Sequence, residues 1–169
     1  MHLGQSMTRL APGEEAPDFT AAAQGGQRIR LREFRGQWVI LYFYPKDRTY
    51  GCTREACSFR DEHAAFRAEG AAVIGVSRDS VESHDEFAAQ HNLPFPLIAD
   101  RGSTILDAYS ARAWYGWSKR VTYLIDPSGR IAKRYAHVNP AGHAAQILQD
   151  IRRLKLERNT HVPIQTKGV

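Results

Sequence analysis

The first strong pattern in the chain is an unbroken run of apolar and aromatic residues at positions 38–44. Its length and β-branched content are typical of a strand buried on both faces. Pro45 ends the run, and a polar turn containing Gly51 follows. Three other apolar runs predict further strands, at residues 71–77, 97–99 and 121–125.

Helical spacing begins directly after the polar turn. From Cys52 onward the apolar positions Ala56, Phe59 and Phe66 recur with the period of a helix, which Gly70 would end. Further helices are expected at 81–91, with Asp79 or Ser80 as its cap, at 103–109, and at 141–157. Strands that alternate with helices indicate an α/β domain with a mixed sheet.

Turn signals complete the outline of the domain. Residues 24–27 separate two short predicted strands, 19–22 and 28–31, and Asp126-Pro-Ser-Gly129 predicts a hairpin whose second strand is 130–136. We expect residues 1–9 to be a flexible leader, 10–157 to form one domain, and 158–169 to be a disordered tail.

Composition narrows the class of protein. The 169 residues are 43% hydrophobic and 24% charged, as in an ordinary globular domain. No apolar window is long enough for a membrane span, and the first residues lack the apolar core of a signal peptide, so we expect a cytoplasmic protein without membrane contact. The net charge of +5 comes from scattered basic residues interleaved with acidic ones, which argues against nucleic-acid binding.

The chain has only two cysteines, Cys52 and Cys57. Cys52 lies where a strand gives way to a helix, and the unpaired N–H groups and dipole of a helix N-terminus stabilise a thiolate, which is the nucleophilic form. On an intact helix a five-residue offset separates the two Cα atoms by roughly 8.6 Å, beyond the ~7 Å that a disulfide allows. The spacing therefore predicts that a disulfide forms only when the start of the helix unwinds; the alternative is that both cysteines are core residues.

Pro45, Thr49 and Cys52 fit the pattern Pro-x-x-x-Thr-x-x-Cys, and the chain resembles peroxiredoxins of the PrxQ, or bacterioferritin-comigratory-protein, branch. The resemblance extends from about residue 10 to 156 and is densest at 42–47 and 51–61. It implies a thioredoxin-like fold with an N-terminal β-hairpin extension. In one departure, Tyr50 stands where the branch usually has proline, and this should leave the loop less rigid.

The resemblance also implies a function: a thiol peroxidase that needs no metal or organic cofactor. Cys52 would be the peroxidatic residue and Cys57 the resolving one. Thr49 would hydrogen-bond the thiolate or a peroxide oxygen, Pro45 would shield the pocket, Arg120 would stabilise the thiolate and the transition state, and Glu55 would orient Arg120. Hydroperoxides would be the substrates and thioredoxin or a similar dithiol the reductant; the branch is often monomeric.

Two other functions remain open from the residues. A thiol–disulfide oxidoreductase on the same fold would normally carry Cys-x-x-Cys, whereas the spacing here is Cys-x₄-Cys. A redox-sensing or binding module could use the disulfide only as a switch. The seven histidines show no metal-ligand spacing and are expected at the surface, while Trp114, Tyr115 and Trp117 are expected to fill the core.

Overall fold

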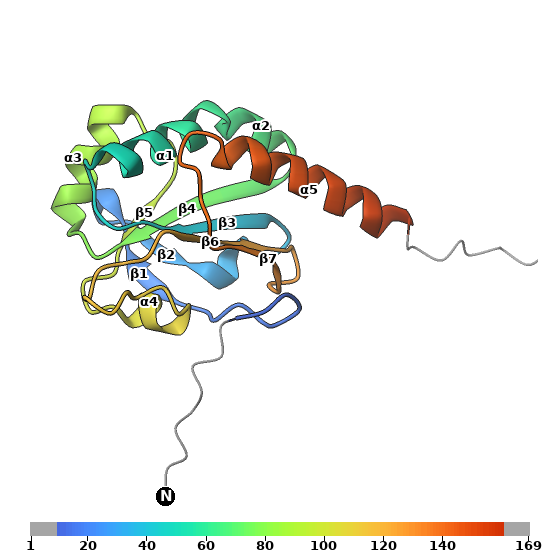
Figure 1. The fold of residues 1–169 in the computed structure, drawn as a ribbon, viewed down its shortest axis with the longest axis horizontal. Coiled ribbons are helices and arrows are strands. Elements are labelled where there is room, and N and C mark those ends of the chain that lie inside the picture. Colours follow the sequence, from blue (N-terminus) through green and yellow to red (C-terminus); the bar gives the residue numbers. More distant parts are fainter. Residues whose placement is uncertain (1–9, 161–169) are drawn as a thin grey trace, which may run out of the picture.

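A mixed five-stranded sheet forms the centre of the computed structural model, which describes residues 10–160 (Figure 1). Its strand order is β5-β4-β3-β6-β7. The strands are β3 (Trp38–Phe43), β4 (Ala71–Ser77), β5 (Leu97–Ala99), β6 (Val121–Ile125) and β7 (Ile131–Tyr135). The β5-β4-β3 half is parallel, whereas β6 runs antiparallel to both β3 and β7. The predicted mixed α/β fold is confirmed.

Two layers cover the sheet. Helices α1 (Tyr50–Asp61), α2 (His63–Ala68), α3 (Val81–His91) and α5 (His143–Thr160) lie on one face, and α4 (Thr104–Ala108) lies on the other (Figure 1). The pattern of β3 explains this arrangement, because its side chains alternate between the faces. Trp38, Ile40 and Tyr42 join the cluster under α1 and α5, while the residues between them pack toward α4.

The N-terminal hairpin consists of β1 (Thr20–Ala22) and β2 (Arg28–Arg30), joined by a short 3₁₀ turn, Gln24–Gly26. It lies on the α4 side of the sheet (Figure 1). The Gln24 amide ties it to β5: its Nε2 donates to the Phe95 carbonyl at 2.8 Å and its Oε1 accepts from the Leu97 N–H at 2.6 Å. A second 3₁₀ turn, Leu31–Phe34, leads into β3.

The boundaries differ from the sequence prediction in two helices. The predicted helix from Cys52 to Gly70 is divided at Glu62 into α1 and α2. The last helix begins at His143 rather than 141 and continues to Thr160, so residues 158–160 are helical. The predicted leader, 1–9, and the remainder of the predicted tail, 161–169, lie outside the described residues. None of the helices between residues 10 and 160 has the length and apolar character of a membrane span.

Two expectations about burial are wrong. Trp114 is 95% exposed, Tyr115 56% and Trp117 40%, because all three lie on a short hairpin loop before β6 and not in the core. His84 and His143 are buried, not at the surface. Each of these rings has a polar partner from a distant part of the chain, which sequence spacing does not reveal.

Candidate active site

Cys52 lies in the first turn of α1, just beyond the end of β3. Its side chain is buried, with 1% of the residue exposed. The helical hydrogen bonds begin with the Thr53 N–H donating to the Thr49 carbonyl at 2.9 Å, so the N–H groups of the residues between them have no helical partner upstream. The sulfur therefore lies in the positive field of a helix N-terminus, and the first turn contains no acidic residue to oppose it.

Arg120 provides a full positive charge at the sulfur. It directly precedes β6, and β6 pairs antiparallel with β3 through the partners Phe43 and Val121. This register brings Arg120 to the edge of the sheet from which α1 starts. Its Nη2 donates to Cys52 Sγ at 3.2 Å, while its Nη1 donates to Glu55 Oε1 at 2.9 Å.

Glu55 is completely buried and lies one helical turn after Cys52, so it faces the same guanidinium. Burial raises the pKa of Glu55 to about 7, although Arg120 acts in the opposite direction through its charge and hydrogen bond. Its second oxygen, Oε2, has no hydrogen-bond partner among the described residues. Glu55 thus holds the guanidinium of Arg120 on one side while Cys52 Sγ accepts from the other.

Thr49 and Pro45 lie in the loop between β3 and α1. Thr49 is the N-cap residue of α1, and its hydroxyl donates to the Lys46 carbonyl at 2.8 Å rather than to the sulfur. The lone pairs of this hydroxyl remain able to accept a hydrogen bond. Pro45 is half-buried and follows the buried Tyr44.

Cys57 lies on the same uninterrupted helix, α1, and both cysteines are free thiols. Its half-buried sulfur is 3.9 Å from His91 Nδ1, at the end of α3. The structure therefore brings Cys52, Glu55 and Arg120 into contact but leaves Cys57 turned toward a different helix. Within residues 10–160, no three His, Cys, Asp or Glu side chains gather where they could hold a metal ion.

Comparison with known proteins assigns the family. The model of the AhpC/TSA family matches residues 12–134, most of the chain. The chain belongs to the AhpC/TSA family of peroxiredoxins.

The relatives place it in the PrxQ/Bcp branch. Peroxiredoxin Bcp of Bacillus subtilis is 40% identical over 83% of this chain and 94% of its own length. The chloroplastic peroxiredoxin Q of Oryza sativa subsp. japonica is 37% identical over 86% of this chain and 69% of its own. A crystal structure of a PrxQ cysteine mutant of Xylella fastidiosa superposes with a TM-score of 0.83 at 31% identity, covering 88% of this chain and 99% of that one. The thioredoxin-like peroxiredoxin fold predicted from the sequence is confirmed.

This peroxiredoxin has a close backbone approach that sequence reasoning missed. A Cβ atom placed on Gly51 would lie 3.1 Å from Arg120 Nη2, closer than most real contacts of this kind. The guanidinium therefore lies over the first turn of α1, where a larger residue would displace it. The glycine directly before Cys52 could have indicated a close approach at this point of the sequence. The three-dimensional structure is needed to show that the Arg120 side chain occupies the space.

Tyr50, the departure from the branch pattern, is the first residue of α1 and is 78% exposed. Its hydroxyl accepts from Arg54 Nη1 at 2.9 Å, and the Arg54 guanidinium lies 5.5 Å from the ring centre. The hairpin loop that carries Trp114, Tyr115 and Trp117 contacts the loop between β3 and α1, where Lys46 Nζ lies 5.3 Å from the centre of the Trp117 ring.

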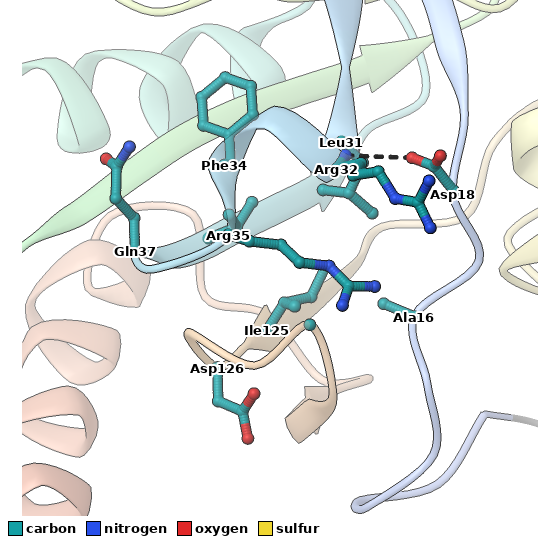
Figure 2. Close-up of a pocket in the computed structure, with 11 residues that line it drawn as sticks. Ala16, Asp18, Leu31, Arg32, Phe34, Arg35, Gln37, Ile125 and Asp126 are labelled. Carbon is teal, nitrogen blue, oxygen red and sulfur yellow. Dashed lines mark hydrogen bonds between the residues drawn. The ribbon is translucent and has the colours of Figure 1, made fainter.

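A small cavity on the opposite face of the sheet is unrelated to this site (Figure 2). It is lined by residues of the N-terminal segment, the 3₁₀ turn before β3 and the β6–β7 turn, including Ala16, Arg35 and Asp126. Its volume of about 20 Å³ has room for roughly one water molecule. It is too small to admit a substrate.

His143, at the start of α5, is a buried group next to the site. Its Nε2 lies 2.7 Å from Thr122 Oγ1, and its ring packs edge-on against Phe59. Burial, with a smaller contribution from the charge of Arg120, lowers the pKa of His143 to about 4.

The pKa of His143 predicts an acid-dependent loss of stability. The folded state holds the His143 ring neutral. The contribution of this neutral ring to the stability of the fold is therefore complete above the unfolded pKa of 6.5 and is lost as pH falls toward 4. The wild type should therefore lose about 3 kcal/mol of unfolding free energy over this range relative to His143→Gln, which cannot titrate. Urea unfolding of both proteins at pH 7 and pH 4.5 measures the difference. Equal pH dependence of the two proteins would show that His143 does not contribute.

Proposed function

We propose that this chain is a thiol peroxidase in which Cys52 is the attacking nucleophile. The observation that carries the proposal is the donation from Arg120 Nη2 to Cys52 Sγ at 3.2 Å, on a sulfur buried at a helix N-terminus. A fixed guanidinium charge and the helix field both favour the thiolate. The same guanidinium can stabilise negative charge that develops on a peroxide oxygen near the sulfur.

In the first step the thiolate attacks the terminal peroxide oxygen. A sulfur–oxygen bond forms, the O–O bond breaks, and the departing oxygen takes a proton and leaves as water or an alcohol. The Cys52 sulfur is oxidised to a sulfenic acid. We propose that Thr49 accepts a hydrogen bond from the bound hydroperoxide, because its own proton is directed to the Lys46 carbonyl, and that Pro45 excludes water from the sulfur.

In the second step Cys57 resolves the sulfenic acid. Its thiolate displaces the hydroxyl from the Cys52 sulfur, so that a disulfide forms and water is released. Helix α1 keeps the two Cα atoms roughly 8.6 Å apart, since they are five residues apart on regular helix. The start of α1 must therefore unwind before the bond can form.

An external dithiol then restores both thiols by exchange, and we propose thioredoxin or a similar protein for this role. The relatives include bacterial Bcp proteins and chloroplastic peroxiredoxins Q. A monomer in the cytoplasm stays our prediction for this chain.

Rapid mixing tests the cycle. The reduced protein is mixed with stoichiometric hydrogen peroxide while tryptophan fluorescence is followed, and free thiols are counted afterwards. Trp117 lies against Lys46 of the active-site loop and should report the change. We expect a fast signal, loss of both thiols and recovery with thioredoxin. Unchanged thiols after mixing would contradict the proposal.

Cys57→Ser separates the two chemical steps. The variant should react with one equivalent of peroxide at the wild-type rate, because Cys57 does not contact Arg120 or Glu55. It should then stop at the sulfenic acid, lose turnover with thioredoxin, and accumulate sulfinic acid when peroxide is in excess. Mass spectrometry of the intact protein distinguishes these forms. Undiminished turnover with thioredoxin would exclude Cys57 as the resolving residue.

A further inference from the structure

A second buried polar cluster lies at the base of the loop that precedes α1, and the proposed chemistry does not use it. Its centre is Asp47, which is 4% exposed, and His84 of α3, which is completely buried. The Asp47 carboxylate accepts hydrogen bonds from the Tyr44 hydroxyl at 2.6 Å and the Ser83 hydroxyl at 2.8 Å, and lies 2.7 Å from His84 Nδ1. Burying a carboxylate is unfavourable unless hydrogen-bond partners surround it, and Asp47 has three such side-chain partners.

The hydrogen bonds of His84 connect the pair to the sheet. His84 Nε2 lies 3.0 Å from the Ile98 carbonyl, which can only accept. Nδ1 faces the Asp47 carboxylate, which already receives two hydroxyl donors. Asp47 and His84 therefore form a buried, hydrogen-bonded pair that ties the loop to α3 and β5.

This pair lies at the boundary of the segment that must unwind. The Asp47 backbone N–H is also fixed, by donation to Asp79 Oδ2 at 2.9 Å. Immediately beyond it, Arg48, Thr49 and Tyr50 are exposed, and Arg48 has a positive φ of 63°, which is unfavourable for a residue other than glycine. Among residues 10–160, the Arg48 side chain pairs only with the exposed Glu86, an ion pair of the weak surface type.

We infer that the Asp47–His84 pair is a latch that holds the loop in the peroxide-reactive arrangement and sets where the unwinding of α1 begins. Residues up to Asp47 stay fixed while the chain from Arg48 onward opens and closes. Asp47 and His84 are positioning residues: they act through Thr49 and the first turn of α1 and do not touch the sulfur. This inference rests on the proposed function, because it concerns the balance between its two steps.

Loss of the latch should therefore affect the two steps differently. Asp47→Ala should slow the peroxide step by about 10- to 100-fold, as expected when reacting groups are displaced by about 1 Å. It should leave disulfide formation unchanged or make it faster, because that step requires the opened segment. Rapid mixing at several peroxide concentrations resolves the two phases, and a purely structural role would not separate them.

Three comparisons sharpen the test. Asp47→Asn can keep the hydrogen bonds, with its amide donating to a neutral His84, and should restore most of the peroxide rate. Asp126→Ala removes another buried, multiply bonded carboxylate, but at the opposite end of the sheet, where Ile125 pairs with Val39. It should not change the ratio of the two phases. Tyr44→Phe, which removes a single hydroxyl donor, should give a smaller effect in the same direction and remains informative if Asp47→Ala does not fold.

Hydrogen exchange supplies a readout that does not depend on peroxide chemistry. In the reduced protein the amides of residues 48–56 should exchange about tenfold faster in Asp47→Ala than in the wild type or Asp126→Ala, because the segment opens more often. Equal exchange in all three proteins, or equal slowing of both kinetic phases, overturns the latch. A wild type that does not react with peroxide overturns the proposed function instead, and the exchange experiment still decides the latch.

Discussion

Cys52→Ser should abolish peroxide reduction, with a fall in rate of at least roughly a thousandfold. The substitution is nearly isosteric in a site where the sulfur is 1% exposed, so the fold should be kept. The chemistry should be lost because the nucleophilic form of cysteine is the thiolate, whereas a neutral serine hydroxyl is a poor nucleophile toward a peroxide oxygen. Peroxide consumption with thioredoxin as reductant measures the effect.

The matched control for this variant is Cys57→Ser, which makes the same atomic change five residues further along α1 and should retain the first turnover. Circular dichroism and thermal unfolding establish that both variants are folded. Substantial turnover in Cys52→Ser would mean that another group performs the reaction. The assignment of Cys52 as nucleophile would then be wrong, whatever the family.

Arg120→Gln should have the second largest effect, slowing the peroxide step by about 10²- to 10³-fold. The variant loses the donor at the sulfur and the fixed charge that would stabilise the departing oxygen. Stopped-flow fluorescence at several peroxide concentrations gives the second-order rate constant. Arg120→Lys keeps the charge but lacks the planar fork, so it cannot donate to Cys52 and Glu55 together. Its rate constant should therefore lie between those of the wild type and Arg120→Gln.

The same substitution should also destabilise the fold, in a way that depends on pH. Arg120 opposes the effect of burial on Glu55, whose pKa is about 7 in its presence, so the pKa of Glu55 should rise further when Arg120 is removed. A carboxyl whose pKa is raised in the folded state contributes most to the stability of the fold below its unfolded pKa, which is 4.5 for Glu55. That stability is lost as pH rises through the folded pKa, about 7. The stability deficit of Arg120→Gln should therefore be larger at pH 8 than at pH 6, and Glu55→Gln in the same chain should reduce it. A deficit that is independent of pH would contradict this account of Glu55.

Much of the fold could be predicted from local pattern. The unbroken apolar run of β3, the helical period after Cys52 and the cap residue Ser80 each have a local physical cause, so the elements appear nearly where the sequence placed them. The break at Glu62 and the end of α5 at Thr160 could not be read in this way, because helix boundaries depend on what the helix packs against.

The amino-acid order alone was enough to predict the family, the position of Cys52 at a strand-to-helix junction, and the fact that Cys52 and Cys57 are too far apart on one helix to form a disulfide. These follow from residue order and the fixed geometry of the backbone. The resemblance implied a role for Arg120, but its contact with the sulfur and the cause of that contact, the antiparallel register of β6 against β3, are visible only in three dimensions. The tertiary structure also decided that His84 is a buried partner of Asp47 while Trp114 is exposed, since burial is a property of elements that meet from distant parts of the chain.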